Sequence, residues 1–190
     1  MKRDPDRLVL FTDAVAAIAI TLLVLPLVEI ISEPGAGRPA ELISHHLPQI
    51  LSFLLSFAVI AQLWMAHHRI FENVREYTHP LMLLNMAWVL TIVVVPFPTG
   101  LVGEYGNDTF TQFFYVGTIL ASSALLSAMT LLVNRDNLTP RVVIASVTPP
   151  VLLLIALALV PLINYWGLLL MLLQSVTSRL IGPRADGTEH

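Results

Sequence analysis

The chain has 190 residues, of which 56% are hydrophobic and only 12% are charged, with a formal net charge of −3. A soluble domain carries about 25% charged residues, so this composition is typical of an integral membrane protein. The small net charge gives no indication of a nucleic-acid partner. The absence of cysteine excludes disulfides and thiolate metal sites.

Long apolar runs separated by short polar breaks predict an all-α integral membrane protein. A helix needs roughly 20 residues to cross about 30 Å of hydrocarbon, and each run is about that long. We expect one domain, residues 1–190, with six transmembrane helices. The expected spans are about 8–31, 44–69, 80–102, 109–133, 141–162 and 164–181.

The basic residues predict that both termini are cytoplasmic. With the N-terminus inside, nine of the Lys and Arg residues fall on the inner side and only Arg38 falls outside. Cytoplasmic loops of membrane proteins carry such an excess. A cleaved signal peptide is the alternative for the first span, but its apolar run exceeds the usual h-region of about 7–15 residues. A lone six-helix unit suggests a multi-pass protein of a prokaryotic plasma (inner) membrane.

The first expected helix carries Arg7 and Asp13 just before an uncharged run from Ala14 to Val28. Ionisable groups at such places are costly and usually mark partners or an ion pathway. Residues six apart do not face each other on one helix, so each is expected to bond to another helix. The arrangement is either an interhelical clamp or a proton-sensitive latch. The candidate donors near the cytoplasmic side are Trp64, His67, His68, Asn85 and Trp88.

One face of the same helix is an aliphatic stripe. Its members lie within about 40° of Ile18 at the helical period: Phe11, Ile18, Leu22, Leu25 and Glu29. Thr21 lies on the shoulder, and Asp13 lies about 140° away. Such a stripe usually packs against a neighbour or lipid. Around a shared axis it would instead form apolar rings that gate by dewetting, with Glu29 at an outer mouth that attracts cations.

The motif Arg7-Leu-Val-Leu-Phe11-Thr12-Asp13, followed by Ala17-Ile-Ala-Ile-Thr21-Leu-Leu, resembles the opening of the transmembrane protein 175 family of lysosomal and prokaryotic potassium channels. Trp64-x-x-His67-His68 and Asn85 extend the resemblance, and the length and layout are similar to those of single-repeat prokaryotic members. Thr12 stands where the family usually has serine. It keeps the hydroxyl but adds a methyl group.

The resemblance implies a homotetramer whose four first helices line a central potassium pore. Ile18 would then form the narrow constriction, Thr21 would contribute to K⁺ preference, and Leu22 and Leu25 would form outer rings. Pro26 directly after Leu25 would bend the outer end of this helix. The resemblance also implies that four residues hold the first helix against the second and third: Arg7, Phe11, Thr12 and Asp13.

On this interpretation the protein is a modestly K⁺-selective cation channel and not an enzyme, with no catalytic residue, metal site or cofactor. Its partners are the lipid bilayer, further copies of itself and K⁺, with other monovalent cations or protons as further candidate permeants. Two alternatives remain open. One is a proton-coupled secondary transporter or proton pathway that uses Asp13, His67 and His68, and the other is an accessory membrane subunit.

Overall fold

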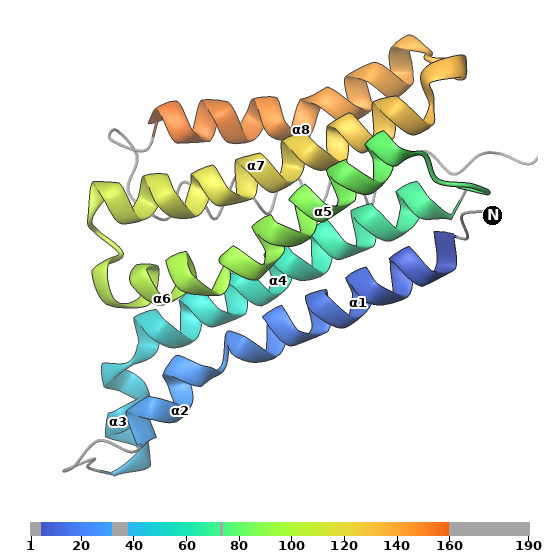
Figure 1. The fold of residues 1–190 in the computed structure, drawn as a ribbon. Helices are drawn as coiled ribbons and strands as arrows, with labels where there is room; N and C mark the ends of the chain where they lie inside the picture. The colour runs from blue at the N-terminus through green and yellow to red at the C-terminus, as the bar shows by residue number, and fades with distance from the viewer. Residues whose placement is uncertain (1–4, 32–37, 73, 160–190) are drawn as a thin grey trace, which may run out of the picture.

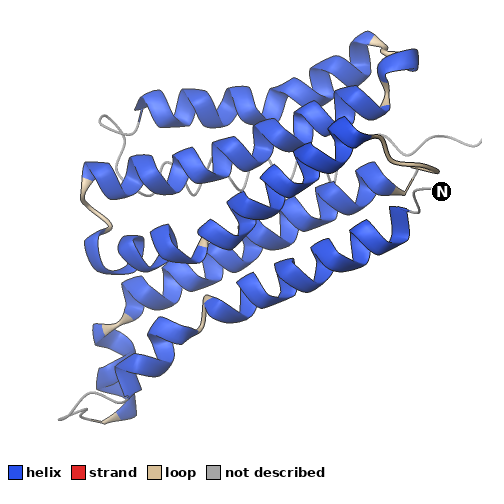
Figure 2. Cartoon of the chain, viewed as in Figure 1, coloured by secondary structure: helices blue, strands red, loops and turns tan. Residues whose placement is uncertain are grey.

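The computed structural model describes residues 5–31, 38–72 and 74–159, and all regular structure within these ranges is helical (Figure 2). The expected span 164–181 lies outside the described residues. The helices are α1 Pro5–Leu22, α2 Leu25–Ile31, α3 Pro39–His45, α4 Leu47–Phe71, α5 His79–Val94, α6 Pro96–Tyr105, α7 Thr109–Val133, the short 3-10 helix η1 Arg135–Asn137, and α8 Pro140–Leu159.

The helices form a bundle with α1 at one edge and α8 at the opposite edge (Figure 1). α1 packs on α4 and α5, α4 packs on α6 and α7, and α7 packs on α8. Trp88, Ile60 and Met129 are fully buried between these helices and form part of the core. The described residues contain five helical stretches long and apolar enough to cross a membrane: Pro5–Ile31, Leu47–Phe71, His79–Tyr105, Thr109–Val133 and Pro140–Leu159.

Two of the expected spans are interrupted helices, and a proline explains each interruption. The first span, expected as one helix over residues 8–31, turns at residues 23–24 between α1 and α2. Pro26 has no N–H, so the Leu22 carbonyl loses its helical donor. The chain tightens instead, and the N–H of Leu27 donates to the Val24 carbonyl at 3.0 Å. The third span breaks in the same way at Val95, where Pro96 begins α6.

α8 contains Pro149 and Pro150 and nevertheless continues without a break. Pro150 removes the N–H that would pair with the carbonyl of Ser146. The hydroxyl of Ser127 on α7 lies 2.6 Å from that carbonyl oxygen and supplies a replacement donor. A proline inside a membrane helix is tolerated where a neighbouring helix satisfies the freed backbone in this way.

Gly103 allows α6 to approach α4 closely. A Cβ at this position would lie 3.1 Å from Ser52 Oγ and 3.2 Å from the Cα of Gln49. We therefore expect Gly103→Leu to lower the free energy of unfolding by about 1–3 kcal/mol, the usual cost of overpacking a close interface. Thermal unfolding in detergent measures the change. Gly117→Leu on α7 is the matched control because a Cβ there meets nothing within 4 Å, and equal shifts in the two variants would contradict the prediction.

Candidate functional site

α1 presents two different faces. The face that packs on α4 and α5 is made of two alanines, a threonine and a leucine, and each is at most 2% exposed. Its members are Thr12, Ala16, Ala19 and, just beyond the helix, Leu23. Small side chains let membrane helices approach closely. α1 is therefore seated against the bundle by its small-residue face.

The opposite face of the first span is the stripe singled out in the sequence. Ile18 is 58% exposed, Leu25 is 52% exposed, and Phe11 and Leu22 are about half exposed. Glu29 on α2 is also exposed. Thr21 is exposed beside the stripe, and its hydroxyl donates to the Ile18 carbonyl at 2.7 Å. Within one subunit, this stripe is thus directed away from the bundle that anchors the helix.

Asp13 is held by Trp64. The indole Nε1–H of Trp64 on α4 donates to Oδ1 of Asp13 at 2.7 Å, and the carboxylate is part-buried. Of the donors that the sequence offered, the structure places Trp64 in this role. The imidazole of His68 lies against the Trp64 ring, with centroids 5.7 Å apart.

Thr12, Asn85 and His67 form a second, fully buried link between α1, α5 and α4. The amide Nδ2 of Asn85 donates to Thr12 Oγ1 at 2.9 Å, and the Thr12 hydroxyl donates to the Leu8 carbonyl at 2.9 Å. Asn85 Oδ1 lies 2.6 Å from Nε2 of His67. The sequence presented Asn85 as a donor to Asp13, but its amide bonds to Thr12.

Counting protons fixes the direction of this network. The Thr12 hydroxyl has one proton, which it gives to Leu8, so Asn85 must turn its NH₂ group toward Thr12. The Asn85 oxygen then faces His67, which must carry its proton on Nε2. The network therefore specifies one amide orientation and one histidine tautomer.

Aromatic rings hold His67 in place. Its imidazole stacks on Trp88 of α5 at 4.4 Å between centroids and on Phe71 of its own helix at 4.6 Å. His67 is fully buried, whereas His68 is exposed. The two adjacent histidines thus point to different environments, and the part of the chain that the structure describes contains no group of three metal-binding side chains.

Arg7 does not join this network in the described part of one subunit. It is exposed on α1, and it makes no ion pair there with another described residue. Phe11 is likewise exposed and lies on the stripe instead of in the interhelical contact. Their predicted role in holding α1 against α4 and α5 has no support in the contacts of the described residues.

A second buried polar cluster was not singled out in the sequence. Thr99 of α6 donates to Ser56 of α4 at 2.8 Å, and Ser56 lies 3.0 Å from the hydroxyl of Tyr115 on α7. Near the N-terminal end of α4, Gln49 Nε2 donates to Oε1 of Glu104 at 3.1 Å. These bonds join α4 to α6 and α7. Isolated Ser, Thr and Gln residues in apolar helices gave the only sequence signal for them.

Removing the donor to Asp13 is expected to destabilise the fold. Trp64→Phe leaves a part-buried carboxylate without its indole partner, which costs about 1–3 kcal/mol. In an Asp13→Leu background the same change should cost much less, with a coupling of about 0.5–3 kcal/mol in the double-mutant cycle. Thermal unfolding of the four proteins in detergent gives this coupling. Additive effects would show that Trp64 contributes packing alone.

Comparison with known proteins shows which family these features resemble. Residues 7–96 match the family model described as the endosomal/lysosomal potassium channel TMEM175. The chain is 42% identical over 106 residues to a protein named as a potassium channel from Chamaesiphon minutus, an alignment that covers 54% of this chain and 51% of the relative. It is 34% identical over 102 residues to another such protein from Streptomyces collinus, covering 54% and 49%.

The human relative, named as the endosomal/lysosomal proton channel TMEM175, is 31% identical over 118 residues, covering 61% of this chain and 23% of the relative. The chain spans about half the length of the curated prokaryotic relatives it matches.

The fold is also similar to a solved structure. The crystal structure of a lysosomal potassium-selective channel TMEM175 homolog from Chamaesiphon minutus superposes with a TM-score of 0.77 at 28% identity, covering 92% of this chain and 96% of that one. These relatives are named as channels, which agrees with the prediction that the chain is not an enzyme. The resemblance to the transmembrane protein 175 family is therefore confirmed: residues 7–96 match that family's model, and the chain is a multi-pass membrane protein with the fold of a TMEM175 homologue.

Proposed function

We propose that this chain is a cation channel that passes K⁺ in preference to Na⁺, and that four copies place α1 around a common axis. The observation that carries the proposal is the exposed stripe of α1 and α2, opposite a face anchored by Thr12 and Asp13. Because the bonds of Thr12 and Asp13 fix the rotation of α1 against α4 and α5, they also fix the direction in which its exposed stripe points. Two relatives are named as potassium channels, which supports the proposal that these stripes line an ion pore.

Ile18 is the proposed constriction of the pore. Its side chain is 58% exposed in one subunit, so a neighbouring copy can cover it. Four such side chains around an axis would form an apolar ring, and Leu22 and Leu25 would form further rings toward the outside. Hydrophobic constrictions gate by dewetting, and a narrow one favours the cation that sheds water more readily, which is K⁺.

Thr21 and Glu29 would supply the polar contacts of the permeation path. The Thr21 hydroxyl gives its proton to the Ile18 carbonyl, so its oxygen lone pairs remain available to a cation. Glu29 lies on α2, beyond the break at residues 23–24. In a tetramer, four carboxylates at the outer mouth would raise the local cation concentration. The break before Pro26 gives this outer part an orientation of its own.

Flux from reconstituted liposomes tests the proposal. Vesicles loaded with K⁺ are diluted into K⁺-free buffer without valinomycin, and the same protein is tested with Na⁺ in a parallel preparation. A channel of the proposed kind releases K⁺ faster than Na⁺, and the flux carries net charge. Folded protein that leaves both gradients intact would contradict the channel and favour an accessory subunit.

Proton permeation is the second candidate, because several relatives are named as proton channels. The part-buried Asp13 on α1 and the buried His67 on α4 are the titratable groups of the interhelical network. A pH-sensitive dye inside the same liposomes, with a K⁺ gradient to set the voltage, reports proton entry directly. Strict exchange of protons for a solute without electrical leak would instead indicate a coupled transporter.

We further propose that the protein is located in a prokaryotic plasma membrane.

A further inference from the structure

The two proline breaks of the bundle border the same cavity. It has a volume of about 320 Å³ and lies between α2, the N-terminal end of α4, and α6. Pro26 and Pro96 both line it. No residue of α2 is buried, although every one of them is described, so this helix does not close tightly against α4 and α6. The breaks thus leave a cavity of the size of a small-ligand pocket, about 300–1,000 Å³.

The cavity combines apolar walls with two carboxylates. Its apolar lining includes Leu23, Phe53 and Phe97. Glu29 of α2 and Glu104 of α6 line it from two different helices. Among the described residues, neither carboxylate forms an ion pair, and no basic side chain lines the cavity. Two negative charges beside apolar surface favour a cation that also has an apolar part.

Gln49 adds a hydrogen-bond acceptor to this cavity. Its Nε2 donates to Oε1 of Glu104 at 3.1 Å. An ionised carboxylate only accepts hydrogen bonds, so this bond requires the NH₂ group of Gln49 to face Glu104. Oε1 of Gln49 is buried and accepts no hydrogen bond from another described residue. A buried acceptor without a donor is costly, and a ligand that brings N–H groups would satisfy it.

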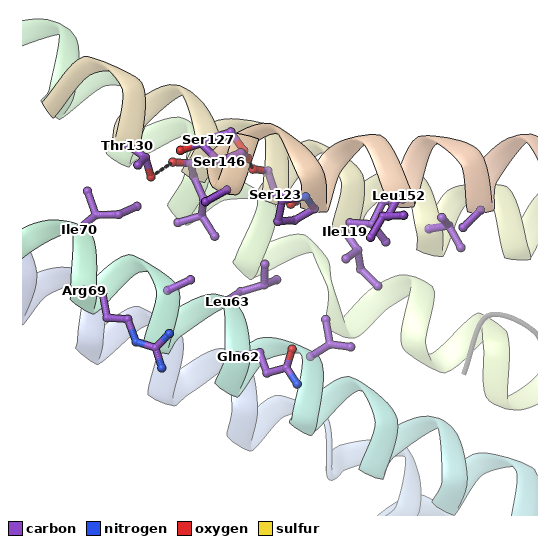
Figure 3. A pocket seen from close by; sticks show the side chains of 18 of the residues that line it. Gln62, Leu63, Arg69, Ile70, Ile119, Ser123, Ser127, Thr130, Ser146 and Leu152 are labelled. Carbon is purple, nitrogen blue, oxygen red and sulfur yellow. Dashed lines mark hydrogen bonds between the residues drawn. The ribbon is translucent and has the colours of Figure 1, made fainter. Parts of the chain in front are cut away.

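A second apolar groove, between α4, α7 and α8, differs in charge. Leu63 and Ile119 are among the residues that line it (Figure 3). Among its described lining residues there is no carboxylate, and the charged side chain is that of Arg69. A cation gains no ion pair there. The carboxylates therefore distinguish the cavity beside α2 from this groove.

We propose that the cavity between α2, α4 and α6 binds a small organic ammonium ion. Its apolar part would lie against Phe53, and its NH₃⁺ group would donate to Glu104 and to Oε1 of Gln49. A primary ammonium has three N–H donors and no acceptor, which matches two carboxylates and an amide oxygen. A metal ion fits less well, because the described residues contain no group of three metal-binding side chains. This proposal does not depend on ion conduction.

Benzylammonium, an apolar ring with one primary ammonium group, is the probe, and neutral benzyl alcohol is its control. The full chain in detergent is titrated with each compound, and the rise of its unfolding temperature with concentration gives the dissociation constant. Benzyl alcohol should bind at least tenfold more weakly than benzylammonium. Glu104→Gln should weaken benzylammonium binding at least tenfold. Glu41→Gln on α3 should leave it unchanged, because Glu41 does not line the cavity.

Filling the cavity is a second, independent test. Gly100 lines it, and a Cβ at this position meets nothing within 4 Å. Gly100→Leu should therefore weaken benzylammonium binding at least tenfold while the ligand-free protein unfolds as wild type does. Gly117→Leu is the matched control, because a Cβ there also meets nothing within 4 Å but Gly117 lies on α7, outside the cavity.

Four outcomes would overturn the proposal. Equal binding of the two compounds would show that the cavity recognises apolar surface and not charge. Unchanged affinity in both Glu104→Gln and Gly100→Leu, with loss in Ile18→Asn, would assign the ammonium to the exposed stripe of α1. Displacement of benzylammonium by micromolar Ca²⁺ would assign the carboxylates to a metal ion. Folded protein that benzylammonium does not stabilise would show that the cavity takes no ammonium ion.

Discussion

Ile18→Asn is expected to raise K⁺ flux through reconstituted protein by about tenfold or more and to reduce its preference for K⁺ over Na⁺. In the proposed tetramer, four Ile18 side chains form an apolar ring that resists wetting, and four asparagine amides in their place would keep water in the constriction. A tenfold increase in flux corresponds to lowering the free-energy barrier to permeation by only about 1.4 kcal/mol. Replacing an apolar side chain by an amide is expected to lower the barrier by at least that amount. The measurement is efflux from K⁺-loaded and Na⁺-loaded liposomes with equal amounts of folded protein.

Ile144→Asn is the control for this experiment. Ile144 is 65% exposed on α8, at the edge of the bundle opposite α1 (Figure 1). The substitution is chemically identical but lies far from the proposed axis, so flux and ion preference should stay at the wild-type level. If the two variants behave alike, the effect of Ile18→Asn reports general damage to the membrane domain and not a pore constriction.

Asn85→Leu is expected to be the most destabilising single change in the interhelical network, because it breaks both of the bonds that Asn85 makes. Leucine has a similar volume, so little space is lost. His67, which is fully buried, would keep its Nε2–H without an acceptor. Leaving such a donor unsatisfied costs about 1–3 kcal/mol, and loss of the bond to Thr12 adds to that cost.

Thermal unfolding in detergent, followed by the loss of the folded protein on size-exclusion chromatography, measures the effect of Asn85→Leu. Thr148→Val is the matched control, since Thr148 is exposed and, among the described residues, its hydroxyl bonds to the Ile144 carbonyl of its own helix. The control should unfold within a degree or two of wild type. Equal loss in both variants would show that the network adds nothing beyond side-chain packing.

Hydropathy located the helical stretches because the bilayer imposes a length and a composition on each of them. It did not locate their breaks. Pro26 was recognised as a bend, and Pro96 interrupts the third span in the same way, whereas Pro149 and Pro150 leave α8 continuous. The difference lies in Ser127 on another helix, which no local pattern in α8 reveals.

The polar partners of α1 could be predicted only as a set. Asp13 needed a donor, and the sequence offered several near the same membrane surface. Choosing Trp64 over Asn85 requires the relative rotation of α1, α4 and α5, which their packed side chains decide. The Ser56–Thr99–Tyr115 cluster was missed for the same reason, since each residue alone looks like an ordinary polar residue in a helix.

The exposed stripe, by contrast, followed from helical periodicity because a single period decides which residues share a face. Periodicity alone did not say whether lipid or other subunits cover that face. The structure adds that the opposite face of α1 is anchored, with Thr12 and Ala19 each 1% exposed. The proposed function requires that Ile18 lines a pore and does not face lipid.

Thiol modification of Ile18→Cys in the otherwise cysteine-free chain tests that point most directly. The measurement is K⁺ flux before and after a charged, membrane-impermeant methanethiosulfonate reagent, with Ile144→Cys treated in parallel. If Ile18 lines the pore, the reagent cuts flux through Ile18→Cys by at least tenfold and leaves Ile144→Cys unchanged. Unchanged flux through Ile18→Cys, after mass spectrometry shows that the thiol has reacted, would contradict a pore lined by α1.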